Sequence, residues 1–471
     1  MKILLIAPSQ KQIYGEKISP PYPSLGLLMI GAVLREMKQT VKFIDIDAQN
    51  YDDYRLIAEI KNYNPALVCL TCVTPTFNAA SRVAGLVKKH SSALVVFGGV
   101  HATIAPEECF KNTDIDFLAI GEGELTIKEL AGRLETGTKD FSGIKGLWSR
   151  NGQAIIKGEA RPLIENLDEL PWPAWDLVEN LNNYQTPDAL RRPVMSIMTT
   201  RGCPFGCTFC CSKQIFGRRY RVRSKDSLIK EIKYYIEKFG VKELHIMDDV
   251  FTLSKERTIE ICRAIQAEKF DLTFSFANGI RVDSVDDEVM QILKDTGFQD
   301  LGFGVETGDE KILESIKKST TKDSMRRAFK LAKKFGFNTW GFFMFGLPGE
   351  TQITIKKTID FAIELDPDFA KFLILKPFPG SEVFNDLNSR GCIKDFNYDN
   401  YGVYTAPIHE LPNLSAQAML KWQRWAYLRF YLRPRKIIQH LLKIKSWSQL
   451  KANLMMVRFL INRIFARGHA K

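Results

Sequence analysis

The stretch that decides the fold is Thr200-Arg201-Gly202-Cys203-Pro204-Phe205-Gly206-Cys207-Thr208-Phe209-Cys210. It follows an apolar run at 194–199 that is typical of a buried strand. The Cys-x3-Cys-x2-Cys spacing places three thiols in one loop. Three thiolates can ligate three irons of a [4Fe–4S] cluster, leaving the fourth iron open to a small molecule. We therefore interpret Cys203, Cys207 and Cys210 as cluster ligands.

Other uses of these thiols stay open at this point. A structural zinc site needs a fourth Cys or His at suitable spacing. Cys211 is available, but it directly follows a ligand, so its side chain points elsewhere. A zinc site and inert buried thiols are the two alternatives.

Downstream of residue 194, strand patterns alternate with helical patterns through six units. This rhythm predicts a partial (β/α)6 barrel of the TIM type, with its chemistry at the C-terminal ends of the strands. We place this domain at 191–400. Its strands are expected at 194–199, 243–247, 273–277, 300–305, 338–344 and 372–375.

Upstream, the same alternation with continuous apolar strands predicts an α/β domain built on a doubly wound parallel sheet, flavodoxin- or Rossmann-like. We place it at 1–138. In such a sheet, ligands bind at the carboxyl ends of the strands. The expected strands are 2–7, 42–46, 67–72, 94–97 and 117–120.

The remaining segments differ in composition from both domains. Residues 139–190 are rich in Pro and Trp, which predicts a linker packed against the domains. Residues 401–471 are expected to form a basic helical C-terminal region. The net charge of +12 lies entirely in this part, because 13 Lys or Arg and no Asp or Glu follow Glu410.

The cysteine loop, with an aromatic residue before its third cysteine, resembles the signature of radical S-adenosylmethionine (radical SAM) enzymes. The resemblance implies that the open iron binds SAM and that reductive cleavage yields a 5′-deoxyadenosyl radical. It also implies SAM contacts at the ends of later barrel strands. The residues at the matching positions are Asp248, Asp249, Glu306, Gly346 and Pro377.

Each of these residues also has a structural interpretation. Asp248 or Asp249 could cap the next helix, and Gly346 could serve a turn. Glu306 ends a strand, where a buried carboxylate needs a partner. The order of these residues along the chain after the three cysteines favours the resemblance to radical SAM enzymes over these separate structural roles.

The first domain resembles the cobalamin-binding (B12) domain of a large radical SAM subgroup. The matching stretches lie at 20–26, 98–103 and 120–124, where small residues allow a flat corrin to approach the backbone. A D-x-H-x-x-G motif is absent, so His101 is not expected to ligate cobalt; it either lines the cofactor or is structural. The resemblance predicts cobalamin contacts at Ser24, Leu25, Gly26, Thr74, Gly98, Gly99, His101, Gly121, Glu122 and Gly123.

Together the cofactors predict SAM- and cobalamin-dependent methylation of an unactivated carbon in a hydrophobic or cyclic biosynthetic intermediate. The alternative within the subgroup is an oxidative cyclase or ring-rearranging enzyme. A tRNA methylthiotransferase needs three further front-domain cysteines, and Cys69, Cys72 and Cys109 are wrongly spaced for that. No individual catalytic residue is assigned.

The partners follow from the same reasoning. We expect a small-molecule substrate, lipid- or tetrapyrrole-like, and an external electron donor of the flavodoxin or ferredoxin type, but no nucleic acid. Helical patterns at 414–429, 436–445 and 448–467 mix aromatic and basic residues, which suits an anionic membrane surface; packing on the barrel is the alternative. Absence of a cleavable leader or an eighteen-residue apolar run predicts a cytoplasmic location, peripheral on the inner face of the membrane if the tail binds there.

Overall fold

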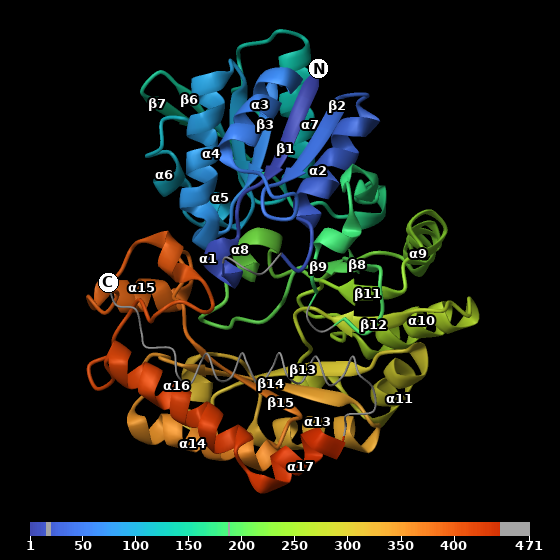
Figure 1. Ribbon diagram of the computed structural model, residues 1–471, viewed down its shortest axis with the longest axis vertical. Helices are drawn as coiled ribbons and strands as arrows, with labels where there is room; N and C mark the ends of the chain where they lie inside the picture. The colour runs from blue at the N-terminus through green and yellow to red at the C-terminus, as the bar shows by residue number, and fades with distance from the viewer. Residues whose placement is uncertain (16–19, 187–188, 443–471) are drawn as a thin grey trace.

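The computed structural model describes residues 1–15, 20–186 and 189–442, with an N-terminal domain above a barrel (Figure 1). The N-terminal sheet has the strand order β2-β1-β3-β4-β5-β6-β7. The first five strands are parallel, and β6 and β7 are added antiparallel. The strands are β1 (Lys2–Ala7), β2 (Thr40–Asp45), β3 (Leu67–Thr71), β4 (Leu94–Gly98), β5 (Phe117–Ala119), β6 (Leu147–Asn151) and β7 (Ala154–Lys157).

Helices cover both faces of this sheet, which confirms the doubly wound architecture. Side chains of α2 and α7 pack on one face, and those of α3 and α4 on the other. Ser24 and Asp52 cap α2 and α3 by accepting hydrogen bonds from backbone N–H groups in the first turn. The helices are α1 (Lys11–Tyr14), α2 (Leu25–Glu36), α3 (Asp53–Tyr63), α4 (Phe77–His90), α5 (Val100–Ile104), α6 (Pro106–Cys109) and α7 (Glu124–Glu135).

The sheet runs beyond residue 138, where we expected the domain to end. Strands β6 and β7 continue it within the segment assigned to the linker. Backbone pairing produces this extension, because residues 147–149 of β6 pair antiparallel with Phe117 to Ala119 along the outer edge of β5. The later part of the segment is a packed connector: Trp175 is buried, and its indole N–H donates to the hydroxyl of Tyr235 over 2.9 Å.

The second domain is a six-stranded partial barrel, as predicted. Two parallel sheets, β12-β11-β8 and β13-β14-β15, meet through bridges from Phe274 to Phe298 and from Ile280 to Phe303. Its strands are β8 (Val194–Ile197), β11 (Glu243–Ile246), β12 (Thr273–Phe276), β13 (Asp300–Glu306), β14 (Asn338–Phe345) and β15 (Phe369–Ile374). Its helices are α8 (Ser212–Phe216), α9 (Lys225–Phe239), α10 (Lys255–Ala267), α11 (Asp287–Thr296), α12 (Glu310–Ser315), α13 (Lys322–Lys334), α14 (Gln352–Leu365) and α15 (Glu382–Ser389).

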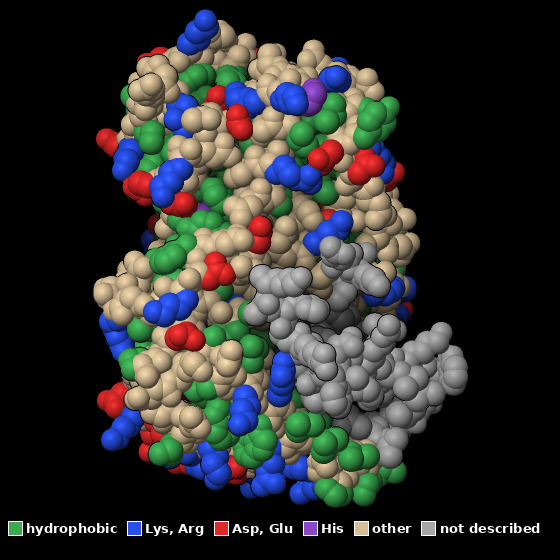
Figure 2. Space-filling model, turned by 60° about the vertical axis from the view of Figure 1, so that its left-hand side comes forward, with side chains coloured by type: hydrophobic (Ala, Val, Ile, Leu, Met, Phe, Trp, Pro, Cys, Tyr) green, Lys and Arg blue, Asp and Glu red, His purple; other side chains and the backbone are tan. Residues whose placement is uncertain are grey.

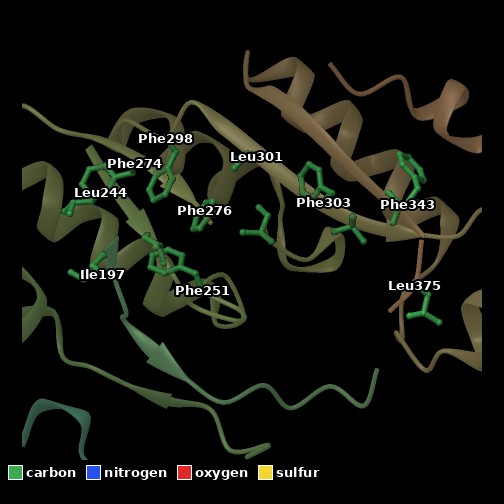
Figure 3. Close-up of a cluster of buried hydrophobic side chains, with 14 of the residues drawn as sticks. Ile197, Leu244, Phe251, Phe274, Phe276, Phe298, Leu301, Phe303, Phe343 and Leu375 are labelled. Atoms are coloured by element: carbon green, nitrogen blue, oxygen red, sulfur yellow. The ribbon is translucent and has the colours of Figure 1, made fainter. Parts of the chain in front are cut away.

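A cluster of aromatic side chains binds the two halves of the barrel together (Figure 3). Phe298 stacks on Phe276 with ring centres 4.6 Å apart and lies 5.3 Å from Phe274. Phe251, in the loop between β11 and α10, contacts Phe276. These ring contacts add to the two isolated bridges that join the two sheets.

The C-terminal region begins with α16 (Ala416–Tyr431) and α17 (Pro434–Leu442). Helix α16 covers the free edge of β15. The Tyr431 hydroxyl accepts from the Ala370 N–H (2.9 Å) and donates to the Ala370 carbonyl (3.0 Å), while Gln423 donates to the Phe372 carbonyl (2.7 Å). An exposed strand edge invites pairing with other chains. Of the aromatic residues in the first predicted tail helix, Tyr427 is buried and Trp422 and Trp425 pack partly buried against the core, so these residues serve packing.

The second tail helix is described only up to Leu442, and the one expected at 448–467 lies outside the described residues. Among the helices that the structure describes, none combines the length and apolarity needed to cross a bilayer. Figure 2 shows Lys and Arg interspersed with Asp and Glu on the face in view. Peripheral membrane contact stays a prediction.

Candidate active site

The cysteine loop is closed at its base by a short antiparallel pair, β9 (Thr200–Arg201) with β10 (Arg221–Val222). Gly202 starts the loop at φ +91°, and a Cβ there would collide with the Arg219 carbonyl oxygen. Glycine is therefore required at this turn. The loop ends in α8, which lies between the N-terminal domain and the lower half of the barrel (Figure 1).

Cys203, Cys207 and Cys210 are half-buried free thiols in this loop. Burial raises the pKa of the Cys210 thiol to about 11 when no metal is bound. In the described part of the chain, no three His, Cys, Asp or Glu side chains converge as they would around a single ion. A cluster differs from a single ion in that each thiolate ligates its own iron.

Two cations that the sequence analysis did not single out lie near these thiols. The Arg281 guanidinium stacks 3.4 Å above the centre of the Phe205 ring, inside the cysteine loop. Lys318 and Arg281 both act on the Cys207 thiol, where their charges oppose the rise in pKa caused by burial. Positive charge stabilises thiolates and a cluster ligated by them. No fixed spacing links either residue to the cysteines, so no sequence signal could have found them.

The two predicted aspartates have different surroundings. Asp248 is buried, and its carboxylate accepts from the Thr199 backbone N–H (2.6 Å) and from the Thr199 hydroxyl. It therefore secures the end of β8, which leaves Asp249 as the member of the pair that faces the cysteine loop. Asp249 accepts a hydrogen bond from Ser212, two residues after Cys210.

Glu306 lies at the end of β13 in a left-handed conformation, φ +65°, at a register shift between β13 and β14. Its carboxylate forms a buried ion pair with Lys318. A Cβ on Gly304 would meet both charged groups, so this glycine makes room for the pair. The carboxylate lies at the C-terminal end of the barrel strand β13.

The loop around Gly346 is held from two sides. The Glu350 carboxylate accepts from the backbone N–H groups of Gly346 (2.6 Å) and Leu347 (3.2 Å), and His409 Nε2 lies 2.8 Å from the Gly346 carbonyl oxygen. Burial raises the pKa of Glu350 to about 8, so it is mainly protonated at neutral pH. Gly346 itself has φ +89°. Pro377, the last predicted SAM residue, is buried just beyond β15.

A cavity of about 300 Å³ lies at the carboxyl ends of the N-terminal strands, facing the cysteine loop. Eight of the ten residues predicted to contact cobalamin line it: Ser24, Leu25, Gly26, Gly98, Gly99, Gly121, Glu122 and Gly123. Gly26 and Gly121 have no neighbouring atom where a Cβ would stand, so backbone is open to a ligand there. The rest of the wall is largely apolar, with Leu170, Pro171 and Trp172 from the connector.

The other two predicted contacts, Thr74 and His101, do not line this cavity. His101 Nδ1 lies 3.1 Å from the Thr74 hydroxyl, and its ring packs against Phe77 and Tyr398, each with centres 4.7 Å away. Burial lowers the pKa of His101 to about 4, which keeps the imidazole neutral. Tyr398 comes from beyond the barrel, so His101 takes part in the contact between the domains.

A second contact between the domains involves Tyr22, in the stretch at 20–26. Its hydroxyl lies 2.6 Å from His245 Nδ1 on β11, and His245 Nε2 lies 2.6 Å from Glu243. His245 is fully buried inside the barrel. The N-terminal domain therefore inserts a phenol into the open side of the barrel.

Comparison with known proteins agrees with this geometry. Residues 197–362 match the radical SAM superfamily, and residues 11–131 match the B12 binding domain. An uncharacterized methyltransferase of Pyrococcus horikoshii is 34% identical over 93% of this chain and 94% of its own length. The chain belongs to the cobalamin-dependent radical SAM family. A [4Fe–4S] cluster, SAM and cobalamin are accordingly its cofactors.

The chain is also similar to other proteins over most of its length. The anaerobic magnesium-protoporphyrin IX monomethyl ester cyclase of Cereibacter sphaeroides is 26% identical over 92% of this chain and 71% of the cyclase. The cobalamin-dependent radical SAM enzyme OxsB, solved with aqua-cobalamin, superposes with a TM-score of 0.77 at 16% identity, covering 98% of this chain and 72% of OxsB. The latter likeness supports the fold alone.

Proposed function

We propose that this enzyme methylates an unactivated carbon of a small hydrophobic or cyclic molecule. The observation that carries the proposal is the position of the cavity. It lies between the glycine-rich strand ends of the B12 domain and the residues that flank the loop of Cys203, Cys207 and Cys210. The whole-length similarity to the Pyrococcus horikoshii methyltransferase supports methyl transfer as the outcome.

When bound, the cofactors supply a carbon-centred radical from SAM and a methyl group on cobalamin. The chain's own residues hold and shield these groups. We assign Asp249 and Glu306 to the polar ends of SAM, because Asp249 accepts a hydrogen bond from Ser212 just after the cysteine loop and the charge of Glu306 acts on the Cys207 thiol within it. The Gly346 loop, fixed by Glu350 and His409, offers a rigid surface for a planar group.

A lipid- or tetrapyrrole-like substrate is supported by the Cereibacter sphaeroides relative, whose name gives a magnesium protoporphyrin ester as its substrate. Leu170, Pro171 and Trp172 make the connector side of the cavity apolar, which would shield the cobalamin that we assign to this cavity, and a reactive intermediate beside it, from water. Reduction of the cluster requires a one-electron donor of the flavodoxin or ferredoxin type.

Oxidative cyclisation is the second candidate, because the Cereibacter sphaeroides cyclase aligns with 92% of this chain. The two reactions differ in their products. Anaerobically reconstituted enzyme is incubated with SAM carrying a deuterated methyl group and with an extract of small hydrophobic metabolites, then analysed by mass spectrometry. Methylation predicts 5′-deoxyadenosine, S-adenosylhomocysteine and a product that has gained the label. Cyclisation predicts 5′-deoxyadenosine without label transfer.

A methylthiotransferase is not favoured by the front domain. Cys69, Cys72 and Cys109 are all buried, and Cys69 packs in the core on one face of the sheet whereas Cys72 and Cys109 pack in the core on the other. Three thiols divided in this way are not placed to ligate one cluster. Iron analysis tests this directly: about four irons per chain supports one cluster, and about eight would require a second.

A further inference from the structure

The wall of the cavity that faces the barrel is formed by both flanks of the cysteine loop. Met198 and Arg201 precede Cys203, and Ile215 and Phe216 belong to α8, which follows Cys210. A ligand in the cavity would therefore touch the chain on either side of the three cysteines. The opposite wall belongs to the N-terminal domain.

Four buried charges join these walls. Arg201 donates to Glu122 over 2.8 Å and to Glu124 over 2.5 Å. Arg221, its partner across β9 and β10, donates to both oxygens of Glu122 at 2.8 and 2.9 Å. The four side chains are 2–7% exposed. Two positive and two negative charges thus neutralise one another in a buried site.

The same arginines hold the loop itself. Arg221 donates to the carbonyl oxygen of Phe216 over 2.9 Å, and the Arg201 guanidinium lies 5.4 Å from the centre of the Phe216 ring. Phe216 is the last residue of α8. Because a buried charge is costly when its partner moves away, the glutamates and the loop must move together.

We propose that Glu122, Glu124, Arg201 and Arg221 are positioning residues that couple the cavity to the cysteine loop, so that cobalamin binding and assembly of the cluster–SAM site strengthen each other. This inference rests on the proposed function in one respect, namely that cobalamin occupies the cavity. It changes the predicted role of Glu122 from a cobalamin contact to the partner of Arg201 and Arg221, which both donate hydrogen bonds to its carboxylate. By linkage, each site must change the affinity of the other by the same factor.

The test measures cobalamin affinity by absorbance titration of the full chain, before and after anaerobic reconstitution of the cluster with SAM added. We expect binding to be about 5- to 150-fold tighter after reconstitution, the usual range of such coupling. In Glu124→Gln this ratio should fall close to one. Glu165→Gln is the matched control, because Glu165 pairs with Arg219 at the surface, with both side chains at least 60% exposed; its ratio should equal that of the wild type.

One further readout and a second variant separate positioning from mere stability. The electron paramagnetic resonance signal of the reduced cluster should change on adding cobalamin to the wild type and stay unchanged in Glu124→Gln. If Glu124→Gln does not fold, Arg201→Lys takes its place: it keeps the buried charge, but a single ammonium lacks the fork that spans two carboxylates. Its ratio should also fall.

The outcomes are distinct. A wild-type ratio of one, or an undiminished ratio in the folded variant, overturns the inference and leaves the proposed function standing. Failure of the wild type to bind cobalamin in either state overturns both. A large wild-type ratio that is lost in the variant and retained in Glu165→Gln supports the coupling.

Discussion

The neighbouring lysines 317 and 318 allow a sharp test of the site electrostatics. Lys318 and Glu306 form an ion pair whose side chains are only 10% and 11% exposed, whereas Lys317 pairs with Glu382 at 63% and 41% exposure. Removing one partner of a buried pair costs about 3–5 kcal/mol, because the other charge is left without compensation. An exposed pair contributes at most about 1 kcal/mol.

Lys318→Met should therefore destabilise the barrel domain strongly. For a domain of about 200 residues, each kcal/mol lowers Tm by roughly 2–4 °C, so we expect a fall of about 6–20 °C. Lys317→Met should lower Tm by no more than about 4 °C. The assay is differential scanning calorimetry of the protein without cofactors, because bound ligands would add their own stabilisation.

The double variant Glu306→Gln/Lys318→Met completes the experiment. With both charges gone, no unpaired ion remains, and most of the lost stability should return. The reasoning is refuted if Lys318→Met melts within about 2 °C of Lys317→Met, or if the double variant is less stable than either single one. The double variant should still bind SAM more weakly than the wild type, because we assign Glu306 to SAM.

Three other predictions concern separate parts of the molecule. Burial raises the pKa of Glu350 from 4.5 to about 8, so between these pH values the folded state holds a proton that the unfolded state has lost. The free energy of unfolding should therefore fall as the pH rises through this window, by at most about 1.4 kcal/mol per pH unit. Glu350→Gln should remove this contribution from melting curves recorded between pH 5 and 8. Tyr431→Phe strips the Ala370 N–H and carbonyl of their partner, so calorimetry should register a loss of about 1–3 kcal/mol; an unchanged Tm would mean that water replaces the hydroxyl. Cys203→Ser should lose most of its iron after reconstitution, whereas Cys211→Ser should keep it, and equal iron contents would contradict the ligand assignment.

Much of the fold could be predicted from the sequence because its signals are local. Continuous apolar runs marked the strands, and the strand expected at 2–7 agrees with β1 at both ends. The three cysteines were found for the same reason, since a loop that supplies three ligands keeps them within eight residues. The sheet's extension by β6 and β7 was missed as part of the domain, because strand pairing depends on a free edge far away in sequence.

What the sequence by itself determined is therefore the order of the domains and the chemical types available at each strand end. Tertiary structure alone decided how those groups are used. It directs Asp248 to Thr199 and Asp249 to the cysteine loop, and it gives Glu122 to two arginines about 80 and 100 positions further along the chain. A carboxylate's role depends on which charges and N–H groups surround it, and these neighbours come together only when distant segments pack.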